Sequence, residues 1–183
     1  MAFEVTFELK ESDLEHFRNV MREAKSEAKN LTDAEILANA KTLSLDIIKS
    51  DVPPFVSERI KKLETLVAMI EDAEWNIPDE ARADVLSALA YFSDPEDLVP
   101  DHIPVLGFLD DAIMIELVAE ELKDDIEAFL EFCNYRSREE GRHGDVAVTR
   151  DEWLHAKRKE LHSRIRNRRS SRSSGRSGFR SVF

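Results

Sequence analysis

The stretch Ala88-Leu-Ala-Tyr-Phe-Ser-Asp-Pro-Glu-Asp-Leu-Val-Pro-Asp-His-Ile-Pro-Val-Leu-Gly-Phe-Leu-Asp-Asp-Ala112 decides the fold that the sequence predicts. It joins the apolar end of one helix to the start of a second helix through a bend that contains three prolines. Proline cannot continue a helix, because it has no N–H and its ring clashes with the preceding turn. The sequence therefore predicts a rigid corner between two buried helices.

The residues of this corner resemble the signature of the YkvA-like family. The signature consists of an aromatic residue, an Asp, a Pro-Asp pair, an Ile-Pro pair, a Gly and a final Asp-Asp pair. Nine residues occupy these positions here: Tyr91, Asp97, Pro100, Asp101, Ile103, Pro104, Gly107, Asp110 and Asp111. The resemblance covers about residues 82–120. It implies no biochemical activity, because the family has none assigned.

Composition limits the class of protein. The chain has 183 residues, 42% of them hydrophobic and 35% charged, which is typical of a soluble, helix-rich single domain. Five glycines and six prolines are fewer turn residues than an all-β chain needs. Cys133 is the sole cysteine, so we expect a reducing, cytoplasmic location. No segment reaches the roughly 18 apolar residues of a membrane-spanning helix, so any membrane association would be peripheral.

Charge is distributed unevenly along the chain. The formal net charge is −12, yet residues 155–183 contain ten Lys and Arg and only one acid, Glu160. This basic tail is therefore near +9, and the first 154 residues are near −21. Such a separation predicts an electrostatic contact, either with a partner or between two parts of the molecule.

Apolar residues recur at helical spacing in five segments of an acidic body that spans residues 1–135. The predicted helices lie at about 12–29, 32–52, 55–70, 85–92 and 113–133. Capping boxes, in which Ser or Thr precedes Glu by three residues, are predicted at Ser12 and Thr32, and Pro54 suits the first turn of the third helix. A short N-terminal strand is predicted by alternation of the apolar residues Phe3, Val5, Phe7 and Leu9. The predicted fold class is mainly α.

Acidic residues of the fifth predicted helix are expected to face water: Glu120, Glu121, Asp124, Asp125 and Glu127. Residues 136–149 are polar and contain two glycines, which predicts a loop. A third capping box at Thr149 predicts a basic amphipathic helix over residues 150–169. His155 and His162 share one face of that helix, and we expect both to be solvated. The Ser/Arg/Gly-rich residues 170–183 predict a disordered tail.

Carboxylates gather in the proline-rich corner. Asp97, Asp101, Asp110 and Asp111 are a ligand set that suits a divalent cation such as magnesium or manganese. Such a site would imply a metal-dependent enzyme or a ligand-binding protein. In the interpretation that we favour, the same residues only cap helices, because Asp110 and Asp111 would lie in a first helical turn, where negative charge is stabilising. A partner-binding surface is the third interpretation.

The basic extension is the second candidate site. It could dock on the acidic helices of its own chain or of a sister subunit, bind nucleic acid by neutralising phosphates, or lie on an anionic membrane. Its apolar end could also act as a tethered docking peptide. The residues that we predict to bind a partner are Trp153, Arg164, Arg166, Arg168, Arg169, Phe179 and Phe183.

Catalytic motifs are not found in the sequence, which contains neither a Gly-x-Ser-x-Gly elbow nor a glycine-rich phosphate loop. We therefore predict a non-catalytic interaction or scaffold protein. In this hypothesis the acidic helical body presents a surface, and the basic extension engages a protein partner.

Overall fold

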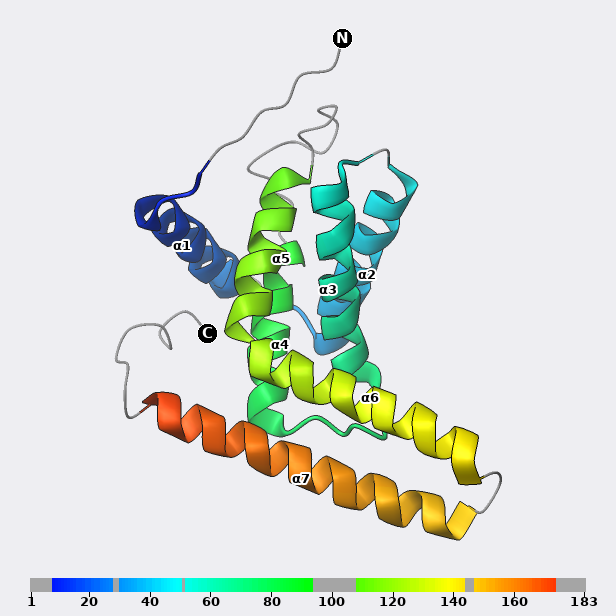
Figure 1. Ribbon diagram of the computed structural model, residues 1–183. Helices are drawn as coiled ribbons and strands as arrows, with labels where there is room; N and C mark the ends of the chain where they lie inside the picture. Colours follow the sequence, from blue (N-terminus) through cyan, green and yellow to red (C-terminus); the bar gives the residue numbers. More distant parts are fainter. Residues whose placement is uncertain (1–7, 28–29, 51, 94–107, 144–146, 174–183) are drawn as a thin grey trace.

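The computed structural model describes residues 8–27, 30–50, 52–93, 108–143 and 147–173 (Figure 1). Within these segments the chain is helical and contains no strand. The elements are α1 (Glu11–Glu27), α2 (Asp33–Lys49), α3 (Pro54–Glu71), α4 (Asp79–Leu89), the 3₁₀-helix η2 (Ala90–Ser93), α5 (Leu109–Glu121), α6 (Lys123–His143) and α7 (Ala147–Ser173). The mainly α fold class is confirmed, but there are seven α-helices in these segments instead of about five.

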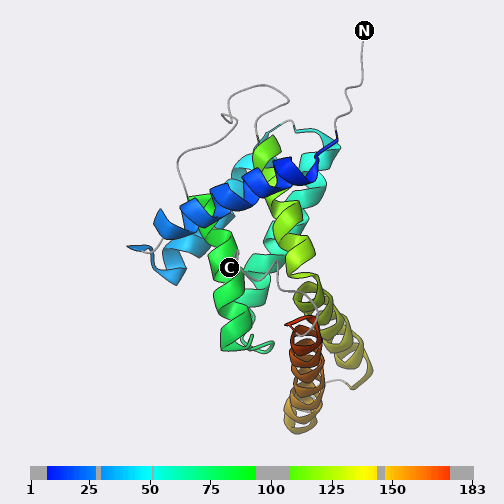
Figure 2. The ribbon, with the colours of Figure 1, turned by 90° about the vertical axis from the view of Figure 1, so that its left-hand side faces the viewer.

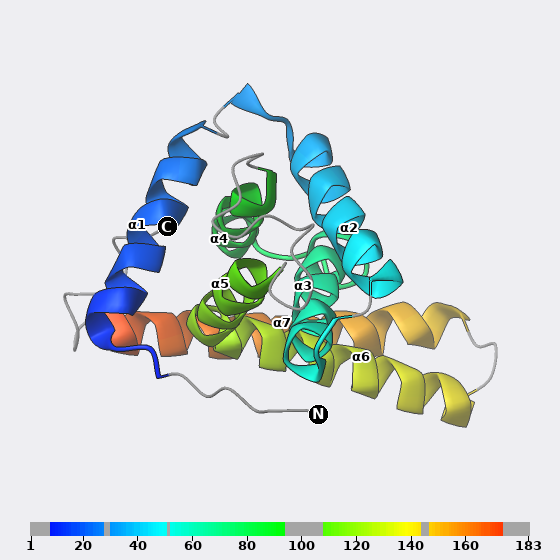
Figure 3. The same cartoon turned by 90° about the horizontal axis from the view of Figure 1, so that it is seen from above.

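Helices α2, α3, α4 and α5 form a bundle in which α3 contacts each of the other three. Helix α1 packs on α4 and η2, whereas α6 and α7 form a hairpin of antiparallel helices that crosses the opposite end of the bundle (Figures 1 and 2). Seen from above, α1 and α2 lie on either side of α3, α4 and α5, and the hairpin passes beneath them (Figure 3). The hairpin is therefore a separate layer, attached to the bundle through α3, α5 and the turn before α4.

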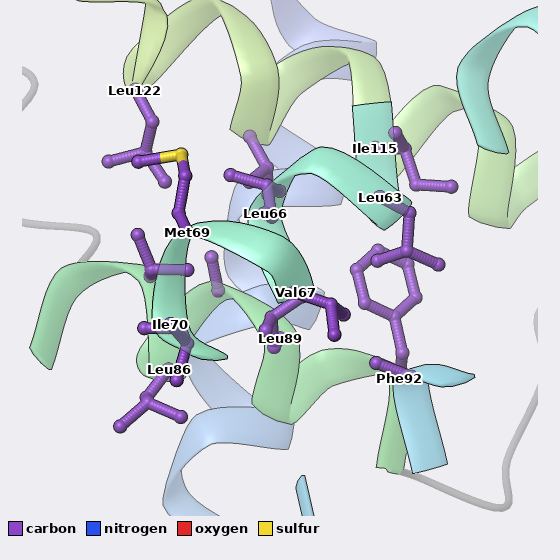
Figure 4. Close-up of a cluster of buried hydrophobic side chains, with 14 of the residues drawn as sticks. Leu63, Leu66, Val67, Met69, Ile70, Leu86, Leu89, Phe92, Ile115 and Leu122 are labelled. Atoms are coloured by element: carbon purple, nitrogen blue, oxygen red, sulfur yellow. The ribbon is translucent and has the colours of Figure 1, made fainter. Parts of the chain in front are cut away.

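The core is built around α3, which is buried along most of its length. Its buried side chains form two neighbouring rows along the helix: Val56, Ile60, Leu63, Leu66, Val67, Met69 and Ile70. Figure 4 shows how they meet side chains of α4, η2 and α5, with Leu122 at the end of α5. Burying one such aliphatic side chain contributes about 1.5–3 kcal/mol.

Both helices that flank the proline-rich corner are buried, as the sequence predicts. Ala88 and Leu89 of α4, and Ala112 and Met114 of α5, have no exposed surface. The corner itself, residues 94–107, lies outside the described residues. The segment just after it begins with Phe108, whose φ of 64° is unusual for a residue with a large side chain.

The start of α1 differs from the prediction. The backbone N–H of Lys10 donates to Oδ2 of Asp13 (2.8 Å), so the helix is capped two residues earlier, at Lys10, and Ser12 lies inside it. The predicted capping box at Ser12 is therefore wrong. The predicted strand is not confirmed, because residues 1–7 lie outside the described residues and Leu9 adopts no regular structure.

The capping box at Thr32 is confirmed in both directions. The N–H of Glu35 donates to the Thr32 hydroxyl (3.3 Å), and the N–H of Thr32 donates to the Glu35 carboxylate (2.8 Å). Helix α3 likewise begins at Pro54, as predicted.

The fifth predicted helix is in fact two helices, which is one reason for the larger helix count. Helix α5 ends where the Leu122 N–H donates to the Val118 carbonyl, and α6 begins when the Asp125 and Ile126 N–H groups donate to the Leu122 carbonyl. Leu122 is buried at this bend. No Gly or Pro marks it, so the break depends on tertiary packing, which turns the first residues of α6 toward α7.

The predicted loop over residues 136–149 is wrong for most of its length. Helix α6 continues to His143 and α7 begins at Ala147, so Thr149 lies within α7 and is not its N-cap. Helix α7 also extends to Ser173, beyond the predicted boundary at 169. The hydrophobic pattern is weak over residues 136–149 because ion pairs between helices, described below, hold this segment in place of a stripe of apolar side chains.

Candidate functional site

The basic helix α7 lies antiparallel to α6, with an apolar seam between them. Leu154, Leu161 and Ile165 of α7 are buried in the same core cluster as Phe129 and Phe132 of α6. This seam fixes the rotation of α7 about its axis. Because the basic residues of α7 flank the seam on both sides, the rotation decides which cations face α6 and which face the loop before α4.

One edge of α7 is neutralised by carboxylates of α6. Lys157 Nζ lies 2.8 Å and Arg164 Nη2 2.5 Å from the carboxylate of Glu131. One turn further, Arg168 Nη1 lies 2.8 Å from Oδ1 of Asp124. Hydrogen bonds from Lys157, and then from Arg164, hold the pKa of Glu131 below its usual value. We call Lys157, Arg164 and Arg168 the paired edge.

Arg169 makes the most buried ionic contact of the described segments. Its guanidinium lies 2.9 Å from Asp125 of α6 and 2.8 Å from Asp84 of α4, and the Arg169 and Asp125 side chains are only 13% and 6% exposed. Burial raises the pKa of the Asp125 carboxyl, although the positive charge of Arg169 opposes this shift. Burial alone would lower the pKa of Arg169, but its attraction to Asp125 and Asp84 outweighs burial and raises it.

Asp124 and Asp125 were expected to face water, and the structure shows that both are buried. The reason is the bend at Leu122, which points the first turn of α6 at the arginines of α7. Each acid therefore has a cationic partner within the chain.

A second ionic cluster joins the hairpin to the turn between α3 and α4. Arg136 of α6 lies 2.8 Å from both Asp72 and Glu74, and Arg150 of α7 contacts Glu74 and Glu140. The Asp72 carboxylate also accepts from the backbone N–H groups of Glu74 and Trp75, which shapes the turn. Although burial works in the opposite direction, Arg136 and these N–H groups hold the pKa of Asp72 below its usual value.

The other edge of α7 has a different environment. It carries five basic or titratable side chains, which we call the cationic edge: His155, Arg158, Lys159, His162 and Arg166. Arg158 donates to the Glu74 carbonyl oxygen (2.8 Å) and approaches Nδ1 of His155 (3.0 Å), and Arg166 contacts the Ser163 hydroxyl (3.1 Å). Among the described residues, no carboxylate forms an ion pair with a member of this edge.

His162 is partly buried, so the expectation that it would be solvated is wrong. Its ring stands edge-on to the indole of Trp75, with ring centroids 4.6 Å apart, and Trp75 also contacts Phe129 and Phe132. Burial, together with the positive charges of Arg158 and Arg166, lowers the pKa of His162 to about 4. The imidazole is therefore neutral at pH 7. His155 is exposed, as expected.

The structure separates the residues that were predicted to bind a partner. Trp153 packs against Tyr135 of α6 (ring centroids 5.4 Å apart), and three of the arginines, Arg164, Arg168 and Arg169, pair with carboxylates of the same chain. Arg166 is exposed on the cationic edge. Phe179 and Phe183 lie outside the described residues.

The aspartates of the corner are only partly described. Asp110 and Asp111 occupy the first turn of α5, as the capping interpretation predicts, and both are buried (3% and 6% exposed). Asp97 and Asp101 lie outside the described residues. In the part of the chain that the structure describes, no three His, Cys, Asp or Glu side chains are arranged to hold a metal ion. The metal site stays a prediction.

Sequence reasoning missed the partners of the basic helix, namely Glu131 and Asp125 of α6, Asp84 of α4 and Glu74. The spacing of charged residues along α6 and α7 contained a signal for these partners. Asp124 and Glu131 are seven residues apart, as are Lys157 and Arg164, so both pairs recur every two helical turns. Placing these repeats side by side in antiparallel order pairs Glu131 with Lys157, as observed, but it pairs Asp124 with Arg164, whereas in the structure Asp124 meets Arg168.

The described helices define a class: a mainly helical protein with two buried helices, α4 and α5, and an attached charged hairpin. Residues 81–117, which run from α4 into α5, match the family model described as "Protein of unknown function (DUF1232)". The match covers this segment alone, and the YkvA-like resemblance is consistent with it. Comparisons with curated proteins and with solved structures gave no significant match. None of the described helices is long and apolar enough to span a membrane.

Proposed function

We propose that this chain is a non-catalytic interaction protein, with a helical body that holds α7 in a fixed orientation and a basic extension that engages a protein partner. One observation carries the proposal. Helix α7 is held through its apolar seam and paired edge, while its cationic edge has no carboxylate partner among the described residues. If the cations of α7 served only to hold the helix in place, we would expect carboxylates to pair with them on both edges of the helix.

The side chains of the hairpin support a binding role more than a chemical one. Outside the cationic edge, charged side chains of the hairpin such as Arg136, Arg150 and Arg169 form ion pairs with α4 and α6 or with the turn between α3 and α4. Burial raises the pKa of the Cys133 thiol, which disfavours the nucleophilic thiolate at neutral pH. A single half-buried thiol is also compatible with the cytoplasmic location that we propose for the protein.

We further propose that Phe179 and Phe183 act as apolar anchors for the same partner. They follow the end of α7 by six and ten residues, within reach of a surface next to the hairpin, because an extended chain spans about 3.3 Å per residue. Aromatic anchors dominate many interfaces, whereas rim charges mainly set orientation and association rate.

The test is affinity capture with the full-length chain as bait. Removing residues 150–183 would delete the buried Leu154, Leu161 and Ile165, so that truncation would unfold the hairpin and is unsuitable. Truncation after Ser173 and the double substitution Phe179→Ala/Phe183→Ala spare this seam. We expect both variants to keep the helical circular dichroism spectrum and to lose a specific partner. A full-length bait that captures no specific protein, or variants that capture the same partners as the wild type, would refute the proposal.

A further inference from the structure

We propose that the cationic edge of α7 binds an acidic helical segment of a partner protein. This inference rests on the proposed interaction role and specifies the chemistry of the partner. It concerns His155, Arg158, Lys159, His162 and Arg166, of which only Arg166 was among the residues predicted from sequence.

The spacing of the edge suits a neighbouring helix. His155, Lys159, His162 and Arg166 follow one another at intervals of four, three and four residues, which places them in a row along one side of α7. At about 1.5 Å per residue, the row is about 16 Å long, or three helical turns. A helix with acids at the same intervals would bring carboxylates opposite the cations Lys159 and Arg166 and opposite the two imidazoles of the row.

The molecule already shows this type of contact on the other side of α7. There, Asp124 and Glu131 of the antiparallel helix α6 meet Arg168, Arg164 and Lys157 at 2.5–2.8 Å. An acidic helix on the cationic edge would repeat that geometry, so α7 would lie between two acidic helices. Each edge would then be neutralised, one within the chain and one by the partner.

The edge is partly preorganised for binding. Arg158 is held by the Glu74 carbonyl, and His162 is packed against Trp75, so these two side chains lose little conformational freedom on binding. Lys159 and Arg166 are exposed and carry permanent charges that a carboxylate can reach. Burial and the charges of Arg158 and Arg166 together depress the pKa of His162, which agrees with a locally positive field.

An acidic protein segment fits this surface better than a nucleic acid does. The edge contains only three permanent cations, and α4 next to it exposes Asp79 and Glu80. A polynucleotide longer than about 16 Å would extend over acidic surface, and neutralising about three phosphates gives weak, strongly salt-dependent binding. A short acidic helix can be confined to the edge and avoid that repulsion.

The experiment measures binding of a fluorescent, alanine-based helical peptide of about 20 residues with Glu at intervals of four, three and four residues. The same peptide with Gln in place of Glu is the peptide control. We expect the full-length protein to bind the Glu peptide in fluorescence anisotropy and the Gln peptide at least tenfold more weakly. Equal binding of the two peptides would overturn the proposal.

Two double variants distinguish binding at the cationic edge from a general effect of net charge. Lys159→Gln/Arg166→Gln removes two exposed cations of the edge and should weaken the Glu peptide about tenfold. Lys49→Gln/Lys61→Gln removes two exposed cations of α2 and α3 and changes net charge equally, and it should leave the affinity within twofold. Equal effects of the two double variants would contradict a site on α7, because only a general charge effect would then be needed.

Two further outcomes identify a different partner and would overturn the choice of an acidic helix. One is tighter binding of a single-stranded oligonucleotide than of the Glu peptide, with the same dependence on Lys159 and Arg166. The other is concentration-dependent dimerisation in sedimentation that the Lys159→Gln/Arg166→Gln variant loses, which would assign the edge to a second copy of the chain. Because the capture experiment with the variant truncated after Ser173 does not use this peptide, failure of the peptide assay is distinguishable from failure of the proposed function.

Discussion

Removing the Arg169 side chain should uncouple α7 from the bundle. In Arg169→Ala, Asp125 would stay buried without its main cationic partner, and Asp84 would lose the same contact. Breaking a buried ion pair in this way costs about 3–5 kcal/mol. Asp84 is 34% exposed and can be hydrated instead, so we expect the lower part of that range, about 3–4 kcal/mol. For a chain of this length, each kcal/mol lowers Tm by about 2–4 °C.

Arg168→Ala is the matched control, because it removes the preceding arginine from the same helical turn. Arg168 is 45% exposed, so the contact with Asp124 is screened by water and its loss should cost about 1 kcal/mol or less. Both variants are compared with the wild type by urea denaturation followed by circular dichroism. Hydrogen exchange of the α7 amides then shows whether the helix opens locally before the bundle unfolds.

The pH dependence gives an independent check of the Arg169 variant. The folded-state pKa of Asp125 is already raised by burial, and without Arg169 it should rise further. An acid with a raised folded-state pKa binds its proton more readily in the folded protein, so stability falls as pH rises through that pKa. The deficit of Arg169→Ala should therefore shrink as pH decreases from 7 toward the ordinary pKa of Asp.

A double-mutant cycle with Asp125→Asn measures the coupling directly. If the pair acts as described, Asp125→Asn should restore part of the stability lost in Arg169→Ala, with a coupling of about 1–3 kcal/mol. A cycle in which the two substitutions are additive, together with equal losses in Arg169→Ala and Arg168→Ala, would refute the idea that buried charge pairing holds α7 in place.

Three further predictions concern other parts of the molecule. Thr32→Ala should lower the free energy of unfolding by about 1 kcal/mol because it removes the cap of α2, whereas Ser12→Ala should change it by less than about 0.5 kcal/mol, a comparison made by urea denaturation. His162→Gln should flatten the loss of stability between pH 7 and pH 5. With a folded-state pKa of His162 near 4, the wild type binds a proton mainly when unfolded in that window, which costs about 1–2 kcal/mol of stability at pH 5 after allowance for partial solvation. Equal pH profiles of the wild type and the variant would contradict the packing of His162 on Trp75. If Asp110 and Asp111 act only as first-turn charges of α5, 1 mM manganese should leave Tm unchanged relative to EDTA, and a reproducible rise would favour the metal interpretation.

The parts of the fold that depend on local chemistry could be predicted from sequence. The cap of α2 at Thr32 and the start of α3 at Pro54 follow from side chains that act within one helical turn. The burial of α3 follows from apolar residues at helical spacing. At Ser12 the same rule failed, because Asp13 provides a competing acceptor and caps the helix two residues earlier.

The hairpin could not be predicted in the same way, because its order depends on contacts between distant residues. The bend at Leu122 has no Gly or Pro, and the second half of α6 has few apolar residues. What holds these segments is a set of pairs such as Arg136 with Asp72 and Arg169 with Asp84, which are 64 and 85 residues apart. Net charge indicated that the extension would meet an acidic surface, but hydrophobic periodicity carries no information about which acids it meets.

The buried contacts of Arg169 and the exposed cationic edge of α7 should respond differently to salt, and this difference connects stability with function. The Debye length falls from about 10 Å at 0.1 M to about 3 Å at 1 M salt, which screens exposed charges far more than buried pairs. The contacts of Arg169 with Asp125 are largely shielded from solvent, whereas Lys159 and Arg166 are exposed. Raising the salt concentration should therefore weaken binding of an acidic partner at the cationic edge while α7 stays packed on α6. A hairpin that dissociated from the bundle at the same salt concentration as the partner would mean that the attachment of α7 also relies on solvent-exposed charge, which would contradict the buried pairing at Arg169.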